Sequence, residues 1–251
     1  ALAFACEPNL IVGKWTSESG AEAGIGGEAG AAAGAGAEAG SGAGASSTCD
    51  GAGGEGAVQR EDPVALPWST GFEDAFCGYT AVAGYCYQNG RASHDIVSSP
   101  VHSGTSAAAF SIVANGTFDD NQTRCLRQGV LPDAAYYSAY FFIPSAPTAA
   151  TNWNLMHFRG GDPAPGAVLD GLWDVSLARQ ADGTYQVSVY DFLRKQQRAA
   201  TNAPPVPIGA WFQLEVYLKR AAGATGTFEV RQDGKLVFSL IGVSTDNTAF
   251  G

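Results

Sequence analysis

The chain has 251 residues and a net charge of −10, with 15% charged residues, 11% aromatic residues and 33 glycines. This composition, low in charge and rich in aromatic residues, favours strands over helices. Residues 1–62 carry nine acidic and two basic side chains, a net −7, which leaves −3 for residues 63–251. Because nucleic-acid binding normally requires a basic stripe, and none is visible, we expect no nucleic-acid partner.

The first six residues, Ala1–Cys6, resemble the end of a secretory signal, with small residues before a cysteine. In bacterial lipoproteins such a cysteine is lipidated. The match is imperfect, because Phe4 is larger than the residue usually found two positions before the lipidated cysteine. The alternative is an ordinary chain start with a free Cys6. We expect residues 1–6 to be a lipobox remnant and the protein to be exported. It would then reside at the outer membrane or cell surface, lipid-anchored through Cys6, or in the extracellular space.

No later stretch approaches about 18 consecutive apolar residues, so we expect membrane contact only through the lipid anchor. Residues 7–66 have the composition of a low-complexity linker, because residues 20–56 contain 14 Gly and 12 Ala. Such a segment buries too little apolar surface to recover its ordering entropy, which predicts a disordered Gly/Ala-rich tether. A packed glycine-rich array is the alternative, but glycine recurs there without a fixed period.

From Trp68 onward the pattern changes to short alternating runs bounded by Gly, Pro, Asn and Asp, and two of the turns, Asp182-Gly183 and Asp233-Gly234, are hairpin signals. The predicted domain, residues 67–251, is therefore all-β, an antiparallel β-sandwich or jelly roll. The predicted strands are Ala107–Ala114, Thr123–Gln128, Tyr136–Ile143, Trp153–Phe158, Leu172–Arg179, Thr184–Phe192, Trp211–Lys219, Thr227–Gln232 and Leu236–Leu240.

Four cysteines remain if Cys6 carries lipid: Cys49, Cys77, Cys86 and Cys125. Export implies an oxidising compartment, so we expect them to form structural disulfides. Three pairings are possible, and both Cys77–Cys86 across a turn and Cys86–Cys125 between two strands are reasonable.

The sequence contains neither a CxxC pair nor a Cys/His cluster, so we expect no zinc site and no other cofactor. Residues 119–121, Asp-Asp-Asn, form an oxygen-rich segment. Such a segment suits structural calcium but is more often a plain turn.

Alternation within the predicted strands separates an apolar face from a polar one. If these strands share one sheet, polar and aromatic side chains gather on its outward face, which suits sugar hydroxyls and sugar C–H faces. The alternative is that any antiparallel sheet with one hydrated side shows the same alternation. The outward residues are His157, Arg159, Asp174, Gln186, Ser188, Tyr190, Glu215, Tyr217 and Lys219.

Several segments in a consistent order are similar to those of concanavalin A-like jelly rolls. They are Gly71–Asp74, Pro100–Gly104, Gln122–Gln128, Trp153–Phe158 and Pro207–Phe212, with Gln232–Lys235 closing a late strand. Over residues 70–245 the chain resembles, in particular, the polysaccharide lyases related to heparin and alginate lyases.

The resemblance implies cleavage of uronic-acid polymers by β-elimination, which needs a group to neutralise the carboxylate, a base and an acid. Arg124 resembles the family's arginine and His157 its histidine. The sequence departs from the family at Leu155, which stands in place of a glutamine. It also ends at Gly251 without the family's late Tyr/Lys strand, so the domain would be truncated or would lack that tyrosine. Tyr190 is then the candidate acid.

We expect a monomeric polysaccharide-binding surface lipoprotein. The remaining polar residues of the outward face would contact the polymer: Arg159, Asp174, Gln186, Ser188, Glu215, Tyr217 and Lys219. The first alternative is a polysaccharide lyase with His157, Arg124 and Tyr190 as its catalytic residues. The second alternative is a structural or adhesion protein whose sandwich contacts another protein.

Overall fold

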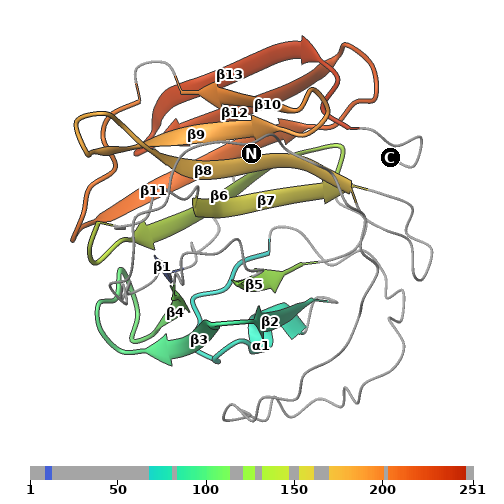
Figure 1. The fold of residues 1–251 in the computed structure, drawn as a ribbon. Helices are drawn as coiled ribbons and strands as arrows, with labels where there is room; N and C mark the ends of the chain where they lie inside the picture. The colour runs from blue at the N-terminus through green and yellow to red at the C-terminus, as the bar shows by residue number, and fades with distance from the viewer. Residues whose placement is uncertain are drawn as a thin grey trace.

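The computed structural model describes residues 9–12, 68–80, 84–113, 121–127, 132–146, 153–160, 170–200 and 203–246, and their regular secondary structure is almost entirely strands (Figure 1). One short helix, α1 (Cys77–Thr80), accompanies them. The strands are β1 (Asn9–Val12), β2 (Tyr85–Asn89), β3 (Ala92–Val97), β4 (Ala107–Ile112), β5 (Gln122–Leu126), β6 (Ala134–Phe142), β7 (Trp153–Gly160), β8 (Asp170–Arg179), β9 (Tyr185–Asp191), β10 (Gln196–Ala199), β11 (Trp211–Lys219), β12 (Gly226–Gln232) and β13 (Lys235–Val243).

The strands form three sheets. A seven-stranded sheet has the order β13-β12-β11-β6-β1-β4-β3, a four-stranded sheet has the order β10-β9-β8-β7, and β2 pairs with β5. All pairings are antiparallel except those of β1, which runs parallel to both of its neighbours, β4 and β6. The prediction of an all-β antiparallel sandwich is confirmed.

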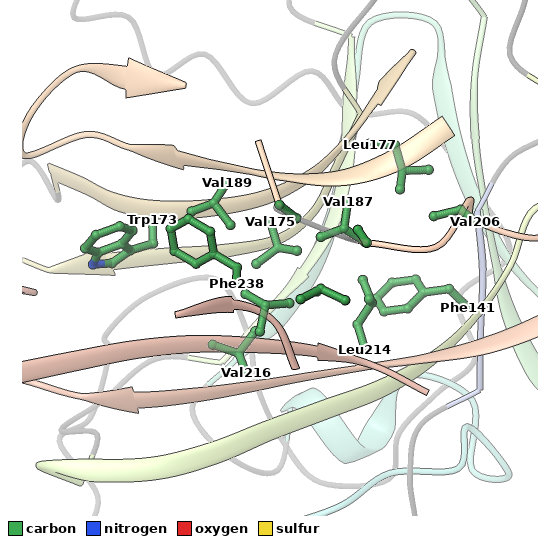
Figure 2. Packing of buried hydrophobic residues seen from close by; sticks show 14 of the residues in the cluster. Phe141, Trp173, Val175, Leu177, Val187, Val189, Val206, Leu214, Val216 and Phe238 are labelled. Atoms are coloured by element: carbon green, nitrogen blue, oxygen red, sulfur yellow. The ribbon is translucent and has the colours of Figure 1, made fainter. Parts of the chain in front are cut away.

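The main core lies between the four-stranded sheet and the part of the seven-stranded sheet formed by β6, β11, β12 and β13 (Figure 2). Trp173 of β8 stacks on Phe228 of β12, with ring centroids 4.4 Å apart, and thereby joins the two layers. Alternation explains this core, because every second residue of β8, β9 and β11 points into it. The inward residues of these strands include Trp173, Val175, Leu177, Tyr185, Val187, Val189, Phe212, Leu214, Val216 and Leu218.

A second, smaller core contains Phe72, Ala108 and Phe110, and Cys125 of β5 packs against it. Ala108 of β4 and Phe141 of β6 both align with residue 10 of β1, so they share one face of the seven-stranded sheet. The β2–β5 pair therefore covers the same face of that sheet as the four-stranded sheet does. The two smaller sheets together form the second layer of the sandwich.

Four strands were not predicted from the sequence, namely β1, β2, β3 and β10. β1 falls within residues 7–66, the segment predicted as a linker, so the predicted linker includes a strand of the sheet. The other predicted linker residues, the lipobox remnant, Asp119 and Asp120 of the possible calcium segment, and Gly251 all lie outside the described residues.

Cys86 and Cys125 face each other across β2 and β5 and form a disulfide, so the alternative Cys77–Cys86 pairing is wrong. Cys77 is also disulfide-bonded, while Cys6 and Cys49 lie outside the described part of the chain. Disulfides indicate an extracellular or periplasmic location. Within the described ranges no helix is long and apolar enough to cross a membrane. The same ranges contain no cluster of three or more His, Cys, Asp or Glu side chains suited to a metal ion.

Candidate functional site

A histidine and an aspartate meet on the outer face of the four-stranded sheet. His157 of β7 pairs in register with Asp174 of β8, and its Nδ1 contacts the Asp174 Oδ1. Both side chains are 15% exposed, so the pair is sheltered but reachable from solvent. With its Nδ1–H donated to this carboxylate, the neutral imidazole presents Nε2 as a proton acceptor.

The pair belongs to a row that crosses all four strands. Asp174 lies opposite Tyr190 of β9, and Tyr190 lies opposite Gln197 of β10. Side chains directly opposite in such a ladder are about 4.5–5.5 Å apart at Cβ. We call His157, Asp174, Tyr190 and Gln197 the His157 row. It combines an acid–base pair, a phenol and an exposed amide on one surface.

An aromatic ring borders this row. Phe192, directly after β9, makes edge contacts with His157 and Tyr190, with centroid distances of 5.9 and 4.7 Å. Phe192 was not among the predicted site residues, although it ends a predicted strand. Its position two residues after Tyr190 was the signal that could have placed it on the same face.

A bulge in β7 changes which residues accompany His157. The register shifts between Asn154 and Met156, and Leu155 packs against the main core. Asn154 therefore shares the face of His157, and its side-chain nitrogen lies 3.3 Å from the His157 Nδ1. Strict alternation from His157 would place Leu155 on that face, but the bulge adds a residue to one strand and turns Leu155 toward the core. Nothing in the sequence marks the bulge.

Two other predicted residues of this sheet are bonded to the protein itself. Ser188 is 2% exposed, and its hydroxyl donates to the Ser176 carbonyl at 3.4 Å. The Gln186 side-chain amide donates to the Ala203 carbonyl at 3.2 Å. Arg159 is exposed, next to a second register shift near the end of β7. Their roles in binding remain predictions.

Glu215, Tyr217 and Lys219 lie on β11, in the seven-stranded sheet. The prediction that β11 shares one sheet with β7, β8 and β9 is wrong. Alternation identifies the polar side of each strand but does not determine the layer to which the strand belongs. These three residues therefore point away from the His157 row, on the opposite side of the sandwich.

Arg124 lies on β5, in register with Tyr87 of β2. Its neighbour Thr123 is buried and bonded to His94, and Cys125 packs on the second core. Arg124 alternates with both, so it points to the outer side of the second layer. Arg124 and His157 thus lie in separate sheets of one layer and face the same side of the molecule.

Two arginines fix the turn that follows Tyr190. Asp191 is fully buried, and its Oδ2 lies 2.9 Å from Arg194 and 3.4 Å from Arg198. A buried carboxylate is stable only when its charge is balanced in this way. The two guanidinium groups therefore hold the β9–β10 hairpin that carries Tyr190 and Gln197.

No protein-family model and no curated protein sequence matches this chain. Among solved structures it is similar to the crystal structure of endo-β-1,4-glucuronan lyase from the fungus Trichoderma reesei. The two are 18% identical, and the similarity covers 64% of this chain and 72% of that one, with a TM-score of 0.48.

Proposed function

We propose that this protein is an exported lipoprotein, anchored through Cys6, that binds a polysaccharide on the outer face of the four-stranded sheet. The observation that carries the proposal is the His157 row, in which four neighbouring strands present an imidazole, a carboxylate, a phenol and an amide side by side. Sugar hydroxyls both donate and accept hydrogen bonds, and their C–H faces pack on rings such as Tyr190 and Phe192. The Cys86–Cys125 disulfide agrees with export.

Binding is tested with the full chain by affinity electrophoresis and titration calorimetry on alginate, glucuronan, pectin and heparin. We expect saturable binding to at least one polymer. A Tyr190→Ala, Gln197→Ala double variant should bind about tenfold more weakly, because it loses a ring and an amide contact. The matched control is Asp133→Asn, which changes an exposed residue remote from the row. Unchanged affinity in the double variant would contradict the proposed surface.

A second candidate is a polysaccharide lyase, and the contact between His157 and Asp174 favours it. In this scheme the His157 Nε2 removes the proton from C5 of a uronate. The C5–H electron pair forms the C4=C5 double bond as the C4–O bond breaks, and the Tyr190 hydroxyl protonates the leaving oxygen. Arg124 or Arg159 would neutralise the carboxylate and so make the C5 proton more acidic.

The two candidates are separated by ultraviolet absorbance, because elimination creates an unsaturated uronate and binding alone does not. A lyase produces a rising signal with a uronate polymer, and His157→Gln should remove that signal even at polymer concentrations high enough to saturate the variant. A folded protein that binds the same polymers with no increase in absorbance is a binding protein.

A further inference from the structure

The outer face of the seven-stranded sheet carries a second group of aromatic side chains. Tyr136 of β6 and Tyr217 of β11 lie opposite each other, with ring centroids 4.8 Å apart, and Tyr136 is 64% exposed. At the other end of the same two strands Trp211 lies opposite Phe142, with centroids 5.4 Å apart. The exposed ring of His102 lies against Trp211 at 5.6 Å. We call His102, Tyr136, Trp211 and Tyr217 the aromatic face.

The two ends of the aromatic face are separated by the length of a strand. Trp211 and Tyr217 are six residues apart on β11, which corresponds to about 20 Å in an antiparallel strand. This span is much longer than one sugar ring. An occupant that contacts both ends must therefore be an extended chain.

One guanidinium and two carboxylates lie near the middle of this face, a net charge of −1. Arg231 of β12 lies 3.7 Å from Glu215 and 3.6 Å from Glu229. Its guanidinium is therefore already paired with two carboxylates, and an acidic polymer laid across the face would meet these carboxylates. Ser239 donates to Glu229 at 3.1 Å, which adds a hydroxyl beside them.

We propose that the aromatic face is a second carbohydrate-binding surface, specific for a neutral, extended polysaccharide. The rings at the two ends stack on sugar C–H faces, and the charged and hydroxyl groups between them accept and donate hydrogen bonds to sugar hydroxyls. Aromatic side chains in register on neighbouring strands form such a platform, because a strand pair holds them at a fixed spacing. The surface is independent of the His157 row, since it lies on the opposite layer, and one molecule could hold two polymers.

The test uses the full chain in pull-down and affinity electrophoresis with three neutral polymers, microcrystalline cellulose, xylan and a β-1,3-glucan. We expect the wild-type protein to bind at least one of them. The double variant Tyr136→Ala, Tyr217→Ala should bind about tenfold more weakly, and Tyr136→Phe, Tyr217→Phe should bind normally because it keeps both rings. Tyr85→Ala, which removes an exposed tyrosine from β2 in the other layer, is the matched control.

Thermal melting of each variant establishes that the sandwich is folded. Full binding by the alanine double variant, or no binding of any neutral polymer by the wild-type protein, would overturn the proposal. Light scattering tests a different occupant: a wild-type dimer that the alanine variant converts to a monomer would make this face a self-association surface instead. Loss of uronate binding through the His157 row has no bearing on these results, because that assay uses different polymers and variants.

Discussion

The imidazole of His157 lies against the carboxylate of Asp174, on two strands that belong to the same four-stranded sheet. Seventeen positions separate these residues in the chain, and the antiparallel register of β7 and β8 brings them together. Asp174 acts through His157 by fixing its orientation and tautomer, so we regard it as a positioning residue.

Replacing Asp174 with asparagine should reduce polymer affinity about tenfold, because the amide no longer fixes the orientation and tautomer with which the His157 imidazole meets the polymer. Titration calorimetry at neutral pH measures the change, and Asp174→Glu should recover part of the affinity by restoring the carboxylate. An Asp174→Asn variant that binds like the wild-type protein would show that the His157–Asp174 contact has no part in binding.

Truncating Trp173 should strongly destabilise the sandwich. This side chain is completely buried, stacks on Phe228 and donates from Nε1 to the Thr245 carbonyl at 3.0 Å. We expect Trp173→Ala to lower the free energy of unfolding by about 3–5 kcal/mol, and Trp173→Phe to cost about 1–3 kcal/mol because it keeps a ring but loses the donor. Urea unfolding measures both. The exposed Leu236→Ala serves as control, with a change within about 0.5 kcal/mol.

Removing the Cys86–Cys125 disulfide should also lower stability. The two cysteines are 39 positions apart. Closing a loop of that length lowers the conformational entropy of the unfolded chain and so raises the free energy of unfolding by about 4 kcal/mol. The variant Cys86→Ser, Cys125→Ser leaves Cys77 unchanged, so urea unfolding of this variant isolates the one bond. A loss below about 1 kcal/mol would mean that the unfolded chain is already restricted in this region.

His94 should make stability depend on pH near neutrality. Burial lowers its pKa below the ordinary value of 6.5, and the charge of Asp95 only partly offsets this. The unfolded chain then binds a proton more readily than the folded one, so stability is full above about pH 6.5 and falls as the pH decreases below it. Denaturation between pH 7.5 and 5 should show a smaller decrease for His94→Gln than for the wild-type protein. If the stability of the two proteins decreases in parallel as the pH is lowered, His94 does not cause the pH dependence.

Much of the fold follows from local sequence. The predicted strand Trp211–Lys219 has the same bounds as β11, because its alternation of apolar and polar residues is unbroken. β2 and β3 were missed because neither strand alternates regularly, and none of their residues is fully buried. Alternation can be recognised from the side chains of one segment. The formation of a strand in a small, half-exposed layer depends instead on partner strands that lie elsewhere in the chain.

The candidate site was only partly predictable for the same reason. His157, Asp174 and Tyr190 were identified because each lies on the polar side of its own strand. The separation of Tyr217 from them depends on which layer β11 joins, and that choice is made by the packing of Leu214 and Val216 against the opposite sheet. The contribution of Asn154 depends on the bulge in β7, which is a property of the paired strands and not of one sequence.

β1 is the element through which the large sheet is continuous. It is hydrogen-bonded to β4 on one side and to β6 on the other, and these two strands do not pair with each other. β4 and β6 lie two strand spacings apart, about 9–10 Å, with β1 between them. Removing residues 9–12 would leave this gap empty, with two unpaired strand edges facing each other. A chain shortened at its start would therefore risk pairing these edges with an intruding strand and aggregating, although its main core would be intact.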